Sequence, residues 1–379
     1  MCPNSGCRYS LENLEMWAAT ESKSGYWIKS MLHGLPVCPG IAQLGTIVRF
    51  GPNSVSINSH TGMSEIYSTR GNVVKANAYS VMSVSSHIPS TISCIDKKQH
   101  AAKRKTLARL FIETVLKGVE DRVLSHIDTL CASLGAGNQT HRFIPKVIGC
   151  VSRRNKICFV QPTIAKYKLD RIFLSTVSTQ IRQFVTQADK CQSILTPKET
   201  WVELLQLVIA GADTTAVVIS VSFFHLLQDP PALSQRHPTR PSLTSCTFLQ
   251  ACITESLRLS PPVTGLAPRK VLRGGIDIDG IHFSEGTIFG SPIYTLHRYG
   301  TSSLRMPFWP FGIGPQSFVA KRLALNEINV TVARTLYLQE MRLDAAWSHK
   351  NEYDLKGWMA SGREGPYVCF GPRAESRHK

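Results

Sequence analysis

The chain has 379 residues, 43% of them hydrophobic, with 43 Lys and Arg against 26 Asp and Glu, which gives a net charge of +17. This composition permits a sizeable core and excludes a low-hydrophobicity disordered chain. The basic residues are scattered and no nucleic-acid motif accompanies them, so we expect no nucleic-acid binding and a basic surface that suits an acidic partner. The eleven cysteines form no Cys-x-x-Cys pair, which indicates neither a zinc site nor a disulfide framework. An intracellular location, most simply the cytoplasm, is expected.

The N-terminal third contains signals for a short hairpin and two helices. Residues 1–45 show no basic flank followed by a long apolar run, so we expect an N-terminal segment without a clear membrane anchor. Two β-rich runs on either side of a Gly-Pro-Asn turn predict a hairpin over residues 46–58. Helices are predicted over residues 62–67 and 96–111, and an acidic residue suited to a helix N-terminus opens the second.

The middle of the chain contains one long apolar run. An amphipathic pattern first covers residues 174–188. Residues 204–227 then include Asp213 as the one acidic residue, and hydropathy alone would allow this run to cross a membrane. A helix that is apolar all round is also what the centre of a large helical protein needs, and we expect that buried helix. A polar linker is expected over 234–247 and a helix over 248–259, after prolines that stop the long helix.

The C-terminal part alternates short strands and one helix. Glycine-punctuated β-rich runs fill residues 265–295, and a last helix is predicted over 319–341. The order of these parts predicts a mainly α fold with small β-sheets. We expect one domain over residues 46–372 and a tail over 373–379.

Inside the long apolar run stands the motif Ala-Gly-Ala-Asp-Thr-Thr, which contains Asp213 and Thr214. An acid next to a hydroxyl in an otherwise uncharged helix costs desolvation energy that a purely structural helix would avoid. A threonine can also bond back to the carbonyl one turn earlier and leave room for a small ligand beside Gly211. The alternative interpretation is a structural helix with satisfied threonines.

Two further pairs place charges on helix faces. Glu255 and Arg258 are three residues apart within Thr-Glu-Ser-Leu-Arg-Leu-Ser-Pro-Pro, and Arg269 follows shortly after. An isolated Glu-x-x-Arg is most often a solvated ion pair. His100 and Arg104 are four residues apart on one predicted helix, where a merely solvated basic face is an equal alternative.

The segment Pro-Phe-Gly-Ile-Gly-Pro-Gln-Ser-Phe-Val-Ala before the last helix resembles the haem-binding loop of the cytochrome P-450 monooxygenases. That loop reads Phe-x-x-Gly-x-Arg-x-Cys-x-Gly, and Phe311 and Gly314 match it. Gln316 stands where the family has Arg, and Ala320 where it has Gly. Phe318 stands where the family has the Cys whose thiolate ligates the haem iron, and a phenyl ring has no lone pair for a metal. The resemblance therefore implies a haem envelope without its axial ligand, and no metal ligand in this loop.

The resemblance covers residues 45–130 and 200–372 and implies a cytochrome P-450-like fold that is partly truncated. It assigns Asp213 and Thr214 to the remnant of an oxygen and proton relay. In the family, the counterparts of Glu255 and Arg258 form a structural ion pair that locks an arginine in a longer meander, and only residues 299–310 remain here for that meander. The implied remnant of the haem envelope is His100, Arg104, Arg269, Phe311, Gly314 and Gln316.

The leading interpretation is a catalytically inactive member of this family. The resemblance implies an ancestral hydroxylation of a small apolar fungal secondary metabolite, such as a terpenoid or polyketide. Haem would be the cofactor, with electrons from an NADPH-cytochrome reductase, and relatives are usually anchored to the endoplasmic reticulum. One alternative is a non-catalytic module that binds an apolar ligand or a partner. The other is an active monooxygenase whose true transcript is intact across residues 298–320.

Overall fold

The computed structural model describes the chain in blocks. These blocks are residues 45–85, 87–118, 120–135, 140–142, 195–229, 247–299, 308–350, 352–353, 355–356, 362–363 and 366–372. The helices are α4 (His60–Tyr67), α5 (Lys97–Ala108), α6 (Glu113–Lys117), α7 (Glu120–Gly135), α9 (Pro197–Gln228), α11 (Thr247–Leu259), α12 (Ile293–Tyr299), α13 (Lys321–Leu338) and α14 (Ala345–Ser348), with 3-10 turns at Asn77–Met82, Arg109–Phe111 and Gly314–Gln316. The strands are β1 (Ile47–Gly51), β2 (Ser54–Ile57), β3 (Val73–Lys75), β4 (Thr140–Arg142), β5 (Arg269–Val271), β6 (Ile276–Ile278), β7 (Ile281–Phe283), β8 (Ile288–Gly290), β9 (Gln339–Leu343), β10 (Leu355–Lys356), β11 (Gly362–Arg363) and β12 (Tyr367–Pro372).

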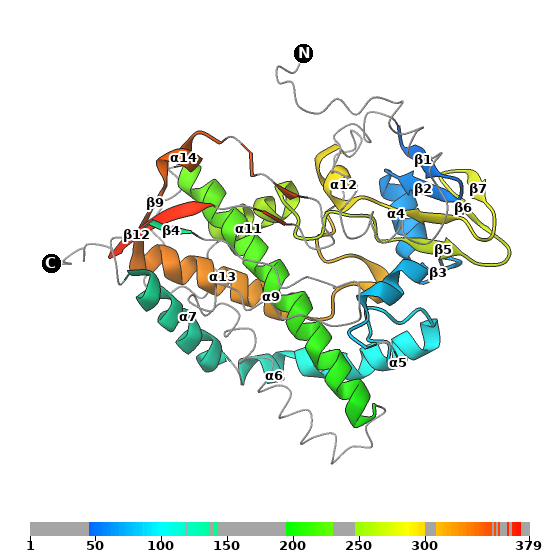
Figure 1. Ribbon diagram of the computed structural model, residues 1–379, viewed down its shortest axis with the longest axis horizontal. Helices are drawn as coiled ribbons and strands as arrows, with labels where there is room; N and C mark the ends of the chain where they lie inside the picture. The colour runs from blue at the N-terminus through cyan, green and yellow to red at the C-terminus, as the bar shows by residue number, and fades with distance from the viewer. Residues whose placement is uncertain are drawn as a thin grey trace.

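The long helix α9 runs diagonally through the helical part of the molecule, between α5 at one end and α14 at the other (Figure 1). It begins with a capping box, because Thr196 Oγ1 accepts from the Glu199 amide and the Glu199 carboxylate accepts from the Thr196 amide. Pro197 occupies the first turn, where its missing N–H costs nothing. The predicted helix over 204–227 is therefore confirmed, and it starts seven residues earlier than its apolar run.

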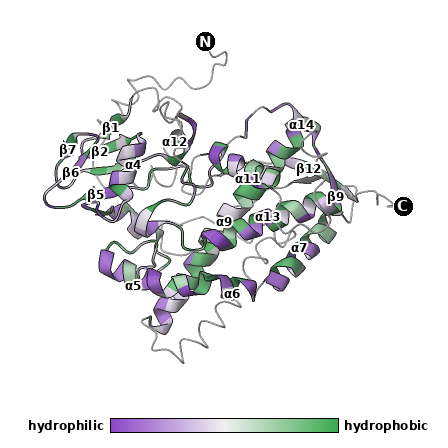
Figure 2. Ribbon diagram, turned by 180° about the vertical axis from the view of Figure 1, so that it is seen from behind, coloured by the Kyte–Doolittle hydropathy of each residue, from purple (hydrophilic) through white to green (hydrophobic). Residues whose placement is uncertain are grey.

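The α9 helix is long and apolar enough to cross a membrane, but 75% of its most apolar window is buried inside the fold. Seen from behind, it is among the most hydrophobic ribbons, α11 and α13 lie alongside it, and α7 packs on the other side of α13 (Figure 2). A helix enclosed by other helices gains its stability from that packing. The burial supports the expected core helix.

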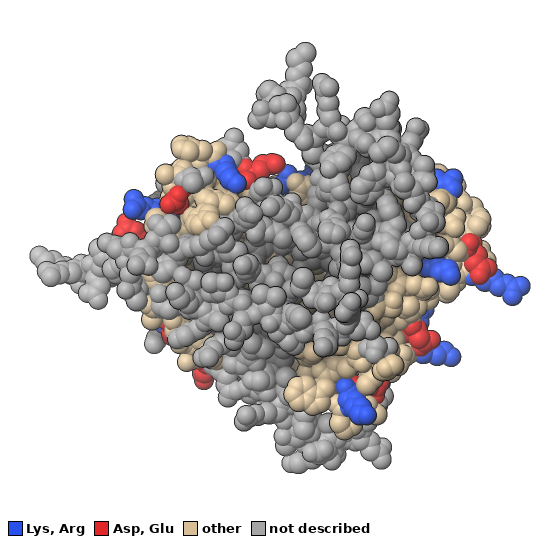
Figure 3. All heavy atoms as spheres, in the orientation of Figure 1, with Lys and Arg blue, Asp and Glu red and all other residues tan. Residues whose placement is uncertain are grey.

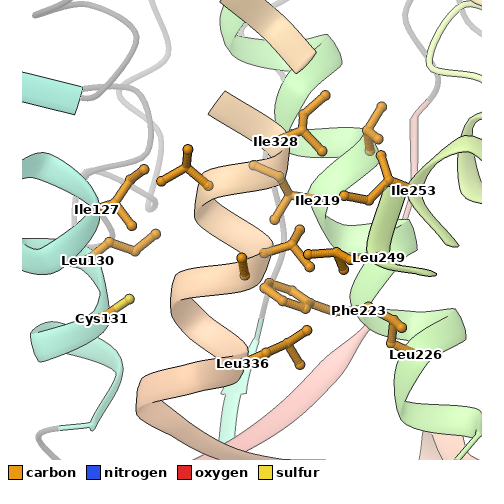
Figure 4. Packing of buried hydrophobic residues seen from close by; sticks show 14 of the residues in the cluster. Ile127, Leu130, Cys131, Ile219, Phe223, Leu226, Leu249, Ile253, Ile328 and Leu336 are labelled. Carbon is orange, nitrogen blue, oxygen red and sulfur yellow. The ribbon is translucent and has the colours of Figure 1, made fainter. Parts of the chain in front are cut away.

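The largest core cluster lies between α7, α9, α11 and α13. In Figure 4, Ile127, Leu130 and Cys131 of α7 point toward α13, and Ile219 and Phe223 of α9 fill the space on its other side. Leu249 and Ile253 of α11 close the far side. These side chains are almost completely buried, and each such side chain contributes roughly 1.5–3 kcal/mol from its burial.

The largest sheet among the described strands has the order β1-β2-β8-β5-β3. The predicted hairpin is confirmed, because β1 and β2 pair antiparallel with Ile47 opposite Ile57. β2 and β8 pair in parallel, whereas β8 with β5 and β5 with β3 pair antiparallel. A second sheet has the order β4-β12-β9. The sheets bring β3, β5 and α4 together at the end of the molecule opposite α13 (Figure 1).

Several predicted boundaries shift. The helix predicted over 96–111 ends at Ala108 and tightens into a 3-10 turn, with Asp96 as its N-cap. The last helix was predicted to reach residue 341 but ends at Leu338, because the chain from Gln339 onward pairs with β12. Helix 174–188 and most of linker 234–247 lie outside the described residues, and the single-domain span 46–372 stays a prediction. The mainly α fold with small sheets is confirmed.

Candidate functional site

The loop over residues 308–318 is pressed against the C-terminal end of α4. Gly314 has φ +67°, and a Cβ at this position would collide with the main-chain oxygen of Tyr67. Gly312, with φ +69°, donates its amide to Trp309 O at 2.9 Å. The Phe318 amide closes the loop by donating to Phe311 O at 2.8 Å. The two glycines let the backbone turn and approach α4 at a distance that no side chain allows.

Phe318 packs into an apolar cluster rather than presenting a polar atom. Its ring stacks on Phe311 with centroids 6.3 Å apart and an interplanar angle of 15°. It also packs against a buried cluster of residues from α5, α9 and α13, including Leu107, Leu207 and Leu323. The side chain at position 318 thus contributes dispersion and area burial and has no atom that can bind a metal.

Arg269 on β5 is the centre of a buried cationic group. Its guanidinium lies over the rings of Tyr67 and Tyr79, at 4.8 and 5.4 Å from the centroids. It donates to Tyr79 Oη at 3.1 Å and to the carbonyl oxygens of residues 267 and 268. Its second terminal nitrogen donates to Gln316 Oε1. The sequence placed Arg269 and Gln316 in the same site, and the structure brings them into contact.

Two side chains from α5 reach the same region. Arg104 donates to Ser317 O and, at 3.1 Å, to Ser317 Oγ, which ties α5 to the loop. His100 is buried, and burial together with the nearby charges of Lys75, Arg104 and Arg269 lowers its pKa to about 4. His100 is therefore neutral near pH 7 and sits among cations.

Lys75 is the fourth member of this group and was not predicted from the sequence. Its ammonium donates to Thr91 O at 2.7 Å and to Ile92 O at 2.8 Å. Burial, followed by the charge of Arg269, lowers the pKa of Lys75 to about 7. The sequence contained a signal for a buried lysine here. Residues 73 and 75 lie on the same face of the short strand β3, and Val73 is buried. A lysine on that face is an exception that calls for an anionic or polar partner.

We name Lys75, His100, Arg104 and Arg269 the cationic cluster. Within the described part of the chain, no carboxylate forms a salt bridge with any of these four residues. Like charges that are buried together repel one another and lower one another's pKa values, and a bound anion relieves this cost. The cationic cluster therefore fits the carboxylate groups of a ligand.

The surface is different from this interior cluster. On the face shown in Figure 3, the described Lys and Arg side chains lie along the rim and alternate with Asp and Glu. No single basic patch gathers on the described part of that face. The described charges on that face are thus dispersed, whereas the buried cations gather around β3, β5 and α5.

Glu255 and Arg258 form a two-contact ion pair on α11, with Arg258 Nε 2.8 Å from Glu255 Oε2 and Nη2 2.6 Å from Oε1. The Glu255 side chain is 53% exposed, so this pair is only partly withdrawn from water. Arg258 Nη1 also donates to His297 O at 2.8 Å. The pair contacts α12 and is separate from the cationic cluster.

The Ala-Gly-Ala-Asp-Thr-Thr motif lies in the middle of α9. Thr214 Oγ1 donates to Ala210 O at 2.7 Å and Thr215 Oγ1 to Gly211 O at 2.6 Å, so both hydroxyls bond back one turn as the sequence analysis expected. Helical structure continues without a break through these residues. Asp213 is partly buried. The oxygen-relay role of Asp213 and Thr214 stays a prediction.

The site therefore fits one part of a haem group and not the other. The cationic cluster has the charge that two propionates need. The residue at the expected iron-ligating position is a phenylalanine whose ring is packed against other side chains. Of the two nearest side chains in the sequence that could bind a metal instead, His297 has its Nε2 occupied by the Trp309 amide. The other, Cys369, lies on β12 and pairs with β4 and β9.

Comparison with known proteins gives a consistent family. A family model described as cytochrome P450 (cytochrome P-450) matches residues 167–302. The cytochrome P-450 monooxygenase atnE of Emericella nidulans is 26% identical over 87% of this chain and 85% of its own length. AKT7 of Alternaria alternata, another cytochrome P-450 monooxygenase, is 25% identical over 86% of this chain and 85% of its own length. The structure of retinoic acid-bound cyanobacterial CYP120A1 superposes with a TM-score of 0.65 at 16% identity, covering 88% of this chain and 94% of that one.

The fold is that of the solved cytochrome P-450 structures, mainly helical with small sheets. The chain is related to the cytochrome P-450 family, and fungal monooxygenases are among its homologues at about 25% identity.

Proposed function

We propose that this chain is a cytochrome P-450-family protein that has lost thiolate-dependent monooxygenation and keeps a site for a ligand with carboxylate groups. The observation that carries the proposal is Phe318, whose ring stacks on Phe311 where a sulfur donor would be needed. A thiolate donates electron density that favours O–O cleavage, and a phenyl ring cannot. Gln316 and Ala320 change the same loop at two more positions.

The test uses the full chain reconstituted with haem, then reduced and exposed to carbon monoxide. We expect the spectrum to lack the red-shifted Soret band that a thiolate ligand produces. Appearance of that band in the unmodified chain would overturn the proposal and would favour an active monooxygenase. Sequencing the transcript across codons 298–320 is the matched check, because a longer intact segment would also support the active alternative.

The variant Phe318→Cys tests whether the missing axial cysteine alone prevents activity, or whether the altered residues around it also do. We expect this single change to give at most a weak thiolate signature and no turnover, because Gln316 and the short segment before the loop remain. A Phe318→Ser variant, which removes the same ring without adding sulfur, is its control. Full turnover by Phe318→Cys would show that the rest of the site is intact.

The ancestral reaction follows from the relatives. These relatives are named as fungal monooxygenases, and we propose that the ancestral enzyme oxidised a small apolar metabolite with electrons from an NADPH-cytochrome reductase. An intracellular, cytoplasmic location belongs to the same proposal, and Cys94, Cys131 and Cys252, which form no disulfide among the described residues, support it.

A second candidate is a binding module without redox chemistry, and the cationic cluster favours it. A ligand that binds the folded chain alone must raise its melting temperature. Apolar carboxylic acids should therefore stabilise the chain, whereas their methyl esters should do so less. Equal effects of acids and esters would exclude the cationic cluster as the binding site.

A further inference from the structure

We propose that His297 is a positioning residue that connects the Glu255–Arg258 pair of α11 to the loop over residues 308–318. The inference rests on the geometry around one imidazole. It does not depend on whether the chain binds iron or catalyses a reaction.

The first half of the connection uses the main chain of His297. Arg258 Nη1 donates to His297 O at 2.8 Å, while its other nitrogens hold Glu255. Glu255 thereby fixes the direction of the Arg258 guanidinium, and the guanidinium fixes the end of α12. Charge-assisted hydrogen bonds of this kind are stronger and more directional than neutral ones.

The second half uses the side chain of His297. Its Nε2 accepts a hydrogen bond from the Trp309 amide at 3.0 Å. The ring is 1% exposed and lies 5.3 Å from the Phe308 ring. Trp309 O in turn accepts from the Gly312 amide at 2.9 Å. The entry of the loop is thus hydrogen-bonded to α12 before the backbone reaches Gly314 and Phe318.

Trp309 has a second anchor on the opposite side. Its indole packs on the ring of His60 at the start of α4, with centroids 4.7 Å apart. The indole therefore touches α4 while the amide is held by α12. A loop held from both sides has fewer conformations to lose when Gln316 meets Arg269.

The direction of the hydrogen bond determines the tautomer of His297. A backbone amide can only donate, so Nε2 must carry the lone pair and Nδ1 the proton. Nδ1 lies toward the carbonyls of Leu257 and Arg258 without completing a hydrogen bond of good geometry with either. Burial, followed by the charge of Arg258, lowers the pKa of His297 to about 4. A neutral imidazole whose Nε2 lone pair accepts the Trp309 amide is therefore the form present at pH 7.

This chemistry explains why a histidine suits the position better than an aliphatic core residue. A leucine would fill the volume but leave the buried Trp309 amide without an acceptor. A glutamine can place its amide oxygen near the position of Nε2, whereas the shorter asparagine cannot reach it. These three substitutions separate acceptance of the hydrogen bond from simple filling of space.

The test is amide hydrogen exchange on the full chain, followed in peptides that cover residues 308–318 and, as an internal reference, residues 47–57. We expect His297→Leu to speed exchange of the loop roughly 5- to 10-fold, and His297→Gln to stay within about twofold of the unmodified chain. The control His349→Leu changes an exposed histidine and should change neither peptide. Equal loop exchange in His297→Leu and the unmodified chain, or a His297→Gln variant as fast as His297→Leu, would overturn the proposal.

A second measurement needs no substitution and serves if His297→Leu does not fold. Nitrogen NMR of the chain labelled with ¹⁵N-histidine reports the protonated ring nitrogen of each histidine, and His297→Gln assigns the signal. We expect the Nδ1–H tautomer at neutral pH, which is the minor form in water. An Nε2–H tautomer or an imidazolium at this position would refute the proposal.

Discussion

Arg269 donates a hydrogen bond to the side-chain oxygen of Gln316, and this contact joins the large sheet to the loop that ends at Phe318. The amide oxygen gives the guanidinium a neutral acceptor at a position where the family has another cation. Arg104 makes a parallel contact from α5 to Ser317. The loop is therefore fixed to the cationic cluster by polar contacts that involve neither a metal nor a thiolate.

The first prediction concerns porphyrins. If the cationic cluster binds propionates and no protein atom binds iron, haem and metal-free protoporphyrin should bind with affinities within about tenfold of each other. The dimethyl ester of the metal-free porphyrin should bind at least roughly tenfold more weakly, because it loses charge-assisted hydrogen bonds. Absorbance titrations of the full chain measure all three.

Two variants of α5 test whether the porphyrins bind at the cationic cluster. Arg104→Met should weaken the binding of both porphyrins equally, whereas Lys98→Met, on the exposed face of the same helix, should leave it unchanged. A preference for haem over the metal-free porphyrin of several hundredfold would instead mean that this chain provides an iron ligand.

The second prediction compares two glycines with positive φ. Gly314 and Gly286 have φ of +67° and +86°, but a Cβ would collide with Tyr67 O at Gly314 and meet nothing within 4 Å at Gly286. Gly286→Ala should therefore cost about 1 kcal/mol from backbone strain alone. Gly314→Ala adds a steric clash with main chain, and we expect a loss of about 3 kcal/mol or displacement of the loop. Urea unfolding of both variants measures the difference, and equal losses would show that the loop is not pressed against α4.

Local signals in the sequence predicted the elements that contain their own start and stop residues. Asp96 caps α5 as its position suggested, and the prolines after residue 229 follow the end of α9. The early start of α9 was also readable, because Thr196, Pro197 and Glu199 form a capping box ahead of the apolar run. The end of α13 could not be predicted from the sequence, because it depends on the pairing of Gln339 with Pro372 on the distant strand β12.

The candidate site shows the same difference between features that the sequence predicts and features that depend on contacts between distant segments. His100, Arg104, Arg269 and Gln316 could be named from the family resemblance, and their contacts with the loop and with one another follow from the fold. The roles of Lys75 and His297 could not be derived that way, because their partners come from other segments. Lys75 donates to residues 16 and 17 positions away, and Arg258 reaches His297 across 39 positions. Such pairs become neighbours only when the chain has folded.

The third prediction concerns pH. Glu327 on α13 is buried with Oε1 unpaired among the described groups, and burial raises its pKa to about 8. An acid with a raised folded-state pKa keeps its proton when the unfolded chain has lost it, so stability is highest near pH 4.5 and falls as pH rises toward 8. Glu327→Gln removes this dependence and should stabilise the chain by about 3 kcal/mol at pH 7 and by little at pH 4.5. Denaturant melts of both chains across this range, with the exposed Glu285→Gln as control, check the sign; parallel curves would contradict the burial.

The fourth prediction concerns the buried ammonium of Lys103. It lies 3.1 Å from Glu199 Oε1 and 3.4 Å from Glu203 Oε1, and Glu203 also accepts the Thr91 amide at 3.0 Å. Lys103→Met leaves the Glu203 carboxylate buried without its cation, which should cost about 3–5 kcal/mol.

The double variant Lys103→Met with Glu203→Gln distinguishes two costs. One is the loss of the attraction between Lys103 and Glu203, and the other is the burial of the Glu203 carboxylate without a cation. We expect it to be more stable than Lys103→Met alone, because the glutamine keeps an oxygen for the Thr91 amide and buries no charge. Urea unfolding of the two single variants and the double variant gives the coupling, and Lys105→Met, exposed on the same helix, should change stability by less than about 0.5 kcal/mol. Additive losses would mean that Lys103 and Glu203 do not act as a pair.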